Sequence, residues 1–222
     1  MPKHDRVLDT PAPLGRRERK KLETKERILE CAVALLASRG YDSTTMEDIG
    51  ECADVARATV FNYFARKEDI VSEVFRRRRA HLAELINETK QTTSNTPERL
   101  RRALTGLARL SEDDPATGRA IVRAWLRAGG PLWPDATDSA ALFADVVRSG
   151  QLEGDISSDV DPTRAGLVIL DAYLGVLYRW VSHEDGQFEF EENLMAALDV
   201  VLAGITRKPP ARRKRKHRRA SV

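Results

Sequence analysis

The chain has only two cysteines among its 222 residues, Cys31 and Cys52. Small secreted domains held together by disulfides need several cysteine pairs, so the sequence argues against a fold of that class. We predict instead that both cysteines pack as small hydrophobic side chains and stay reduced in a cytoplasm.

Long apolar runs are also absent. The longest one, residues 165–178, is interrupted by Asp171, and the first 17 residues contain no apolar stretch that could serve as a signal peptide. The sequence therefore predicts a cytoplasmic protein that does not enter a membrane.

The sequence signatures of catalysis are missing as well. The chain has no glycine-rich phosphate loop and no Gly-x-Ser-x-Gly elbow, and its four histidines are scattered at positions 4, 81, 183 and 217. No group of residues has the spacing of metal ligands. We therefore expect no catalytic residue, no metal and no cofactor, which makes an enzyme improbable.

Positive charge is concentrated near the two ends of the chain. The formal net charge is +3, yet residues 207–219 hold nine Lys or Arg residues and no acid, which leaves the other residues at −6. A second basic cluster, residues 16–21, lies just before the first periodic segment. Pro209 and Pro210 end the last expected helix, and the charge beyond them predicts a disordered cationic tail. Such a tail either solubilises the protein or binds phosphates, and the sequence leaves both open.

Apolar residues at helical spacing are what the sequence has in abundance. No alternating strand pattern occurs, and turn-forming Gly, Pro, Ser and Asp separate the periodic segments. This pattern predicts an all-α chain of about nine helices. Their expected ranges are residues 17–39, 45–53, 57–63, 67–91, 97–112, 115–128, 136–149, 162–183 and 188–206.

Local signals mark several helix ends. Gly40, followed by Tyr41, has the position of a left-handed residue that ends the first helix. Thr44 followed by Glu47 predicts a capping box at the start of the second helix. Three later helices are expected to begin with a capping side chain before a proline in the first turn. These pairs are Thr96-Pro97, Asp114-Pro115 and Asp161-Pro162.

Two short helices joined by a tight turn and packed on a longer helix form a helix-turn-helix, and residues 45–63 fit this description. In the second short helix, Val60, Phe61 and Phe64 are expected to face inward. The stretch TTMEDIGECADVARATVFNYFARKEDI, after a helix that ends in Arg39-Gly40-Tyr41, resembles the DNA-binding head of the TetR family of bacterial transcriptional regulators. The resemblance covers about residues 22–72, and the remainder resembles the family in architecture only.

Three residues depart from the family pattern. Ala56 stands where a serine usually caps the recognition helix, so the first amides of that helix need other partners. Asp54 stands where glycine is common, and aspartate tolerates the left-handed conformation that the turn requires. Phe61 replaces a frequent tyrosine whose hydroxyl contacts a DNA phosphate, a contact that Tyr63 could supply instead.

In a helix-turn-helix the second helix enters the major groove and its first side chains reach the base edges. Arg57 is the expected base reader because its guanidinium matches the O6 and N7 acceptors of guanine. Other side chains at helix starts and on the exposed side of the second helix are expected to contact bases or phosphates, or alternatively to pack or cap locally. They are Thr44, Thr45, Ala58, Thr59, Asn62, Tyr63 and Lys67.

The last two expected helices carry broad apolar faces with small residues between them, which predicts an intersubunit four-helix bundle; an intramolecular core alone is the alternative. The predicted interface residues are Leu167, Leu170, Leu174, Leu194, Leu198, Val201 and Leu202. Aromatic residues in the middle of the chain are either core or walls of an apolar effector cavity. The predicted cavity residues are Trp125, Trp133, Phe143, Asp171, Tyr173 and Tyr178.

Asp171 is unusual because it interrupts an apolar run on the stripe of Leu167, Leu174 and Tyr178. A carboxylate buried there needs a partner. The sequence leaves two roles open, an ion pair with Arg123 or Arg127, or contact with a polar group of the effector.

Together these patterns predict four regions: a flexible basic N-terminal arm over residues 1–21, a helix-turn-helix domain over 22–66, a helical ligand-binding and dimerisation domain over 67–206, and the tail over 207–222. The expected function is that of a homodimeric transcriptional repressor, released from a palindromic double-stranded operator by a small-molecule effector of unknown identity. The alternative is a helical interaction protein that binds acidic partners or nucleic acid without sequence specificity.

Overall fold

The computed structural model describes residues 15–93, 95–183 and 188–206 of the chain. Within these ranges the regular structure is helical, which confirms the all-α prediction. The helices are α1 (Arg16–Arg39), α2 (Met46–Cys52), α3 (Arg57–Tyr63), α4 (Lys67–Thr92), α5 (Thr96–Glu112), α6 (Pro115–Arg127), the 3-10 turn η1 (Gly130–Leu132), α7 (Asp138–Glu153), α8 (Pro162–Ser182) and α9 (Phe190–Ile205).

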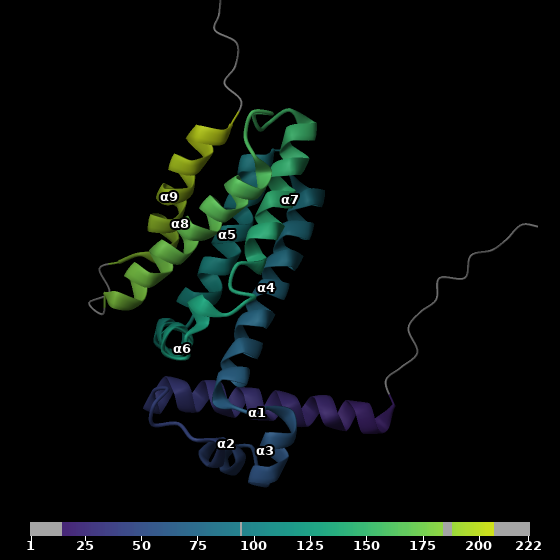
Figure 1. Cartoon of the computed structure of the whole chain (residues 1–222), viewed down its shortest axis with the longest axis vertical. Coiled ribbons are helices and arrows are strands. Elements are labelled where there is room, and N and C mark those ends of the chain that lie inside the picture. Colours follow the sequence, from purple (N-terminus) through teal and green to yellow (C-terminus); the bar gives the residue numbers. More distant parts are fainter. Residues whose placement is uncertain (1–14, 94, 184–187, 207–222) are drawn as a thin grey trace, which may run out of the picture.

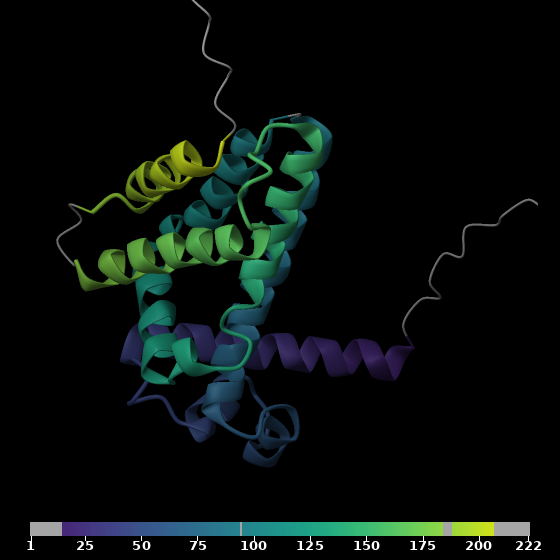
Figure 2. The same cartoon turned by 45° about the horizontal axis from the view of Figure 1, so that its top comes forward.

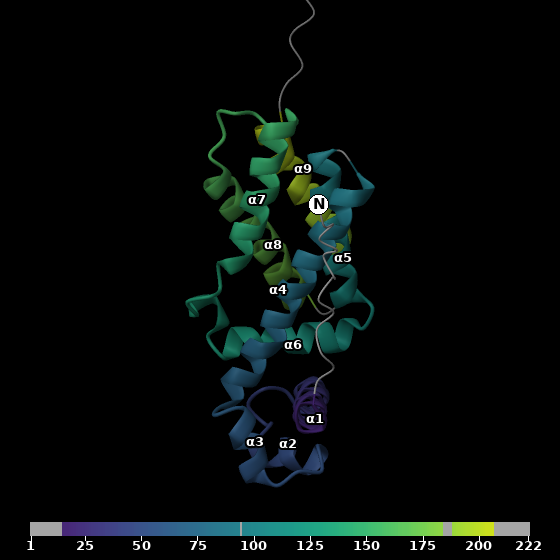
Figure 3. The ribbon, with the colours of Figure 1, turned by 90° about the vertical axis from the view of Figure 1, so that its right-hand side faces the viewer.

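The helices form a small head and a larger body, joined by the long helix α4 (Figure 1). The head consists of α1, α2, α3 and the start of α4, and α2 and α3 lie on the side of α1 that faces away from the body (Figures 1 and 3). The body contains the rest of α4 and helices α5 to α9, with α6 packed across α1 (Figure 2).

Each part has its own hydrophobic core. The head core is built from α1, α2, α3 and the first turn of α4, with Ile28, Ile49 and Val60 fully buried at its centre. The body core is larger, and Trp180, Phe143 and Phe190 are its largest fully buried side chains. Burial of apolar surface on this scale is the main stabilising contribution to both parts.

The helix boundaries follow the prediction closely except at α7. The predicted end at residue 149 is wrong, because Gly150 lies inside the helix and packs against another element. A Cβ atom at Gly150 would lie 2.6 Å from Thr96 Oγ1 and 2.7 Å from the side chain of Ile156. Gly154, with φ +86°, ends the helix instead. The first glycine therefore serves close packing, and the second supplies the left-handed stop.

Two predicted caps are shifted by one residue. The capping box of α2 consists of Thr45 and Asp48, not Thr44 and Glu47. Helix α5 is capped by Asn95, whose side chain accepts from the amide of Glu98. Asp114 and Asp161 cap α6 and α8 as predicted.

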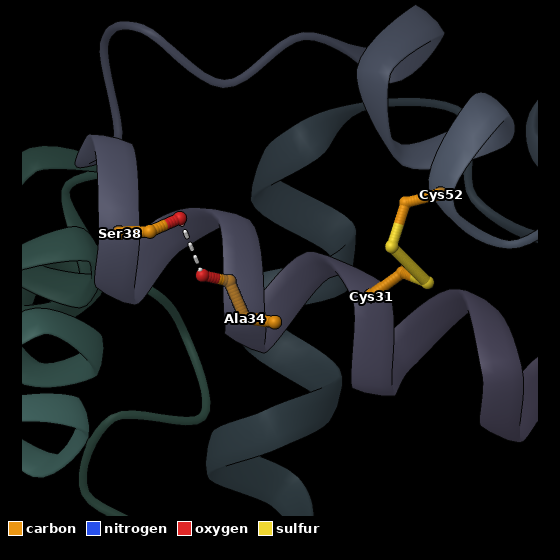
Figure 4. The surroundings of a disulfide bond; sticks show 4 residues. All are labelled: Cys31, Ala34, Ser38 and Cys52. Carbon is orange, nitrogen blue, oxygen red and sulfur yellow. Dashed lines mark hydrogen bonds between the residues drawn. A yellow bond between two sulfur atoms is a disulfide. The ribbon is translucent and has the colours of Figure 1, made fainter.

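The prediction of two reduced cysteines is wrong in this structure. Cys31 of α1 and Cys52 at the end of α2 form a disulfide, with a Cα–Cα distance of 5.7 Å (Figure 4). The sequence gives no sign of this pairing, because it arises only when α2 packs across α1. Cys31 is half-buried and packs against the head core as predicted, whereas Cys52 is exposed.

The first 14 residues of the predicted arm and the predicted cationic tail lie outside the described residues. Residues 16–21 form the first turns of α1, which agrees with the helix predicted from residue 17 and not with an arm that extends to residue 21. Helix α8 is long and apolar enough to cross a membrane by composition, but half of its most apolar stretch is buried inside the body, as in a core helix.

Candidate DNA interface and effector cavity

The turn between α2 and α3 has the conformation that the sequence predicted. Asp54 adopts a positive φ of +50°, the only non-glycine residue to do so among those described. Ala56 precedes α3 without a side-chain cap, and its carbonyl accepts from the amides of Thr59 and Val60 at 2.8 and 3.3 Å.

Arg57 is the first residue of α3, and its side chain is 62% exposed. Its guanidinium pairs with Glu47 Oε1 of α2 at 2.5 Å and lies over the ring of Phe61, 5.3 Å from the centroid. An exposed ion pair of this kind is weak, so the side chain can exchange it for another acceptor. Glu47 therefore pairs with the guanidinium of Arg57 without fixing it in this position.

The outward side of α3 carries most of the other predicted contacts. Ala58 and Asn62 are exposed, and Thr59 and Tyr63 are half-buried. Phe61, expected to face inward, is 40% exposed instead and supports the guanidinium of Arg57. The ring of Phe61 thus supports Arg57, although it lacks the hydroxyl of the tyrosine that is frequent at this position.

Two side chains that were predicted to contact phosphates form hydrogen bonds within the protein instead. Thr44 is fully buried and donates its hydroxyl to the carbonyl of Gly40 at 2.8 Å. The ammonium of Lys67 donates to the carbonyls of Tyr41 and Thr44 and lies over the ring of Tyr41. Both side chains therefore hold the loop between α1 and α2, and neither is free to contact DNA as predicted. Thr45 remains exposed at the start of α2.

A basic groove lies beside α3, and the cations that line it on α1 were not among the predicted DNA contacts. It has a volume of about 670 Å³ and separates the first half of α1 from α3. Its α1 wall carries four cations and no acid, namely Arg17, Lys20, Lys21 and Arg27, while Thr59, Asn62 and Tyr63 form the opposite wall. The basic cluster at residues 16–21 was visible in the sequence, but its position next to α3 requires the straight helix that the structure reveals.

A small cavity lies in the body between α4, α5, α6, α7 and α8. Its volume is about 50 Å³, and Trp125, Trp133 and Tyr173 line it as predicted. Phe75, Arg78, Arg79 and Ser139 also line it and were not predicted. Three predicted cavity residues lie elsewhere: Phe143 is fully buried in the core, and Asp171 and Tyr178 are exposed on the outer face of α8.

The two roles considered for Asp171 are therefore both wrong. Its stripe on α8, shared with Leu167 and Tyr178, faces outward rather than into the body, so the carboxylate is exposed on the surface of the protomer. Arg127 pairs with Asp42 of the head at 2.6 Å.

The cavity shares residues with the junction between head and body. Trp125 lines the cavity and belongs to a hydrophobic cluster that includes Leu36 of α1 and Val71 of α4. Its ring stacks on Phe75 with a centroid distance of 4.8 Å. A group that enters the cavity thus meets a side chain whose other contacts reach the head.

Ion pairs between α1 and α4 form a second link at the junction. Lys25 pairs with Glu73 at 2.9 Å, and Arg77 binds both carboxylate oxygens of Glu26 at 2.6 Å. Hydrogen bonds from Arg76, and then from Lys25, lower the pKa of Glu73 to about 2. The carboxylate therefore stays charged at every physiological pH.

The predicted dimer interface requires correction. Four of its residues, Leu170, Leu194, Leu198 and Leu202, are buried within the protomer, because α9 packs its apolar face on α5 and α8. Leu167 is 38% exposed, and Leu174 and Val201 are half-buried. Other apolar side chains on the outer faces of α8 and α9 are more exposed, namely Val168, Tyr178 and Val200.

Comparison with known proteins finds relatives that match the head and relatives that span both head and body. The family model described as bacterial regulatory proteins, tetR family, matches residues 28–74. The transcriptional repressor KstR of Rhodococcus jostii is 26% identical over 196 residues, which cover 84% of this chain and 86% of that protein. The repressor KstR2 of Mycobacterium tuberculosis is 27% identical over 187 residues, covering 81% of this chain and 92% of that protein.

A solved structure is similar over the same length. The TetR-family repressor FadR of Thermus thermophilus, in complex with lauroyl-CoA, is 26% identical and has a TM-score of 0.67, covering 84% of this chain and 98% of that one. The match of the family model over residues 28–74, together with the geometry of α1 to α4, leads to one conclusion: the chain carries the DNA-binding head of the bacterial regulatory proteins of the tetR family.

Proposed function

We propose that this protein is a dimeric transcriptional repressor that leaves a palindromic operator when a small molecule enters its body. The observation that carries the proposal is the position of Trp125, which forms part of both the cavity wall and the cluster that holds α1. The relatives named as repressors favour the same function, and they favour a regulator over an enzyme.

The recognition helix α3 supplies base contacts, with Arg57 as the main reader of guanine. Thr59 and Asn62 contact bases or phosphates, Ala58 meets a thymine methyl, and Thr45 and Tyr63 contact the backbone. The cations of α1 along the basic groove neutralise phosphates beside the recognition helix, a contribution that lacks sequence preference and weakens with salt.

Dimerisation uses the outer faces of α8 and α9, which run side by side along one side of the body (Figures 1 and 2). Leu167, Val168 and Tyr178 form the exposed apolar stripe on α8, and Ala196 and Val200 continue it on α9. Two such helix pairs form a four-helix bundle with two-fold symmetry. The symmetry sets two heads about one DNA turn apart, or a multiple of it, which requires a palindromic operator.

Effector binding acts through the crowded cavity. A volume of about 50 Å³ holds only a few water molecules, so a larger ligand must displace side chains of the wall. Trp125 and Phe75 form the wall nearest to the head. Their movement shifts α6 against α1 and changes the separation of the two recognition helices, which lowers DNA affinity by the coupling between the sites. The protein acts in the cytoplasm, where its operator DNA lies.

Selection of bound sequences from random duplex DNA tests this proposal. A palindromic sequence with guanine at the Arg57 contact is expected, and a library of small molecules should contain compounds that release it. Binding without sequence preference would instead favour the alternative of a helical protein for acidic partners.

A further inference from the structure

Arg78 differs from the other charged side chains of the cavity because no carboxylate pairs with it among the described residues. Its guanidinium donates to the hydroxyl of Ser111 at 2.6 Å and lies over the ring of Phe75, 5.9 Å from the centroid. Both partners are neutral, and the arginine is half-buried. The cavity wall therefore holds a positive charge with several unused N–H donors.

The neighbouring arginine, Arg79, does have a carboxylate partner. Arg79 forms an ion pair with Asp135, another residue of the cavity wall, so these two charges cancel. The remaining cavity residues are apolar, aromatic or hydroxyl-bearing, which leaves Arg78 as the net charge of the cavity. A neutral ligand would remove water from this guanidinium without replacing it, whereas an anion would supply the missing partner.

A second space beside Arg78 indicates on which side of the guanidinium an anion would bind. Arg78 also lines an open groove of about 460 Å³ between α1, α4 and α6. Glu30 and Asp114 of this groove have no cationic partner among the described residues, whereas Glu26 is held by Arg77. These carboxylates disfavour an anion in the outer groove, so an anion that contacts Arg78 is most stable on its inner, cavity side.

We propose that the effector is an apolar anion whose charged group binds Arg78 and whose apolar body lies against Phe75 and Trp125. The inference rests on the proposed function and adds the chemical class of the ligand. A carboxylate, sulfonate or phosphate ester presents the oxygens that a guanidinium binds through two parallel N–H bonds. On binding, Arg78 exchanges the hydroxyl of Ser111 for this anion.

Two dyes of the same framework test the proposal on the full-length protein. The probe 8-anilinonaphthalene-1-sulfonate carries a sulfonate, and N-phenyl-1-naphthylamine lacks it; both fluoresce in apolar sites. Arg78→Gln should weaken binding of the sulfonate at least about tenfold, the effect of losing a charge-assisted hydrogen bond, and change binding of the neutral dye less than about twofold. Arg78→Lys should weaken binding of the sulfonate dye by a smaller factor, because an ammonium keeps the positive charge but lacks the planar fork of the guanidinium.

Arg76→Gln is the matched control, since Arg76 is an exposed arginine of the same helix and its loss changes the net charge equally. Equal sulfonate binding by the Arg78→Gln and Arg76→Gln variants would overturn the proposal while leaving a ligand cavity intact. If neither dye binds the unaltered protein, the effector cavity itself is wrong. Circular dichroism checks folding, and if Arg78→Gln melts early, Arg78→Lys carries the comparison between the two dyes.

Discussion

Reduction of the disulfide between Cys31 and Cys52 should destabilise the head without altering the body. The bond joins α1 to α2 across a sequence separation of 21 residues. A crosslink of that span lowers the entropy of the unfolded chain by an amount that corresponds to about 3 kcal/mol at 25 °C. Cys52 is exposed, so a reductant in solution can reach the bond. In a reducing cytoplasm the head would therefore work in its less stable, dithiol form.

Amide hydrogen exchange followed by mass spectrometry measures this effect separately for head and body. With dithiothreitol, exchange in α1 and α2 should accelerate by a factor that corresponds to about 3 kcal/mol, while α7 and α8 stay unchanged. The Cys31→Ser, Cys52→Ser double variant should show the exchange rates of the reduced protein, and dithiothreitol should not change them. Unchanged exchange in the head, with both thiols shown to be free by alkylation, would refute the reasoning.

Three further predictions follow from single side chains. Arg57→Ala should lower discrimination between operator and scrambled DNA by about 1–3 kcal/mol with the melting temperature unchanged; equal discrimination in a competition assay would remove Arg57 from the reading surface. Val200→Asp should give a folded monomer by light scattering, whereas Leu198→Asp should unfold the protomer; a folded Leu198→Asp monomer would reverse the assignment. Glu73 should stabilise the protein fully above pH 4.5, and this contribution, on the order of 3 kcal/mol, should be lost as the pH falls toward 2; denaturant unfolding of Glu73→Gln should lack that loss.

The fold could be predicted from the sequence because its signals are local. Helical periodicity, Asp114 and Asp161 before prolines, and Asp54 in the turn each depend on a few neighbouring residues. The exception at α7 shows the limit of such signals. Gly150 resembles a helix stop by composition, yet its reason is contact with Thr96, more than 50 residues away in the chain.

The candidate sites were harder to predict, because burial depends on which face of a helix meets a neighbour. The stripe of Asp171 and Tyr178 and the stripe of Tyr173 and Leu177 are both mainly apolar. Only packing against the other helices of the body decides that the second stripe is buried. The same holds for Thr44, whose hydroxyl turns to a carbonyl inside the loop. The role proposed for Arg78 could not be found in the sequence, because only the folded structure shows that no carboxylate pairs with it among the described residues.

The most direct test of the central claim is calorimetry of effector binding with and without operator DNA, using a compound that releases the selected operator. Linkage requires that operator DNA weaken the binding of this compound by the same factor by which the compound weakens the binding of DNA. We expect a factor of roughly 5 to 150, the usual range of such coupling. Identical effector affinity in the presence and absence of operator would contradict the proposal that the cavity at Trp125 controls the head.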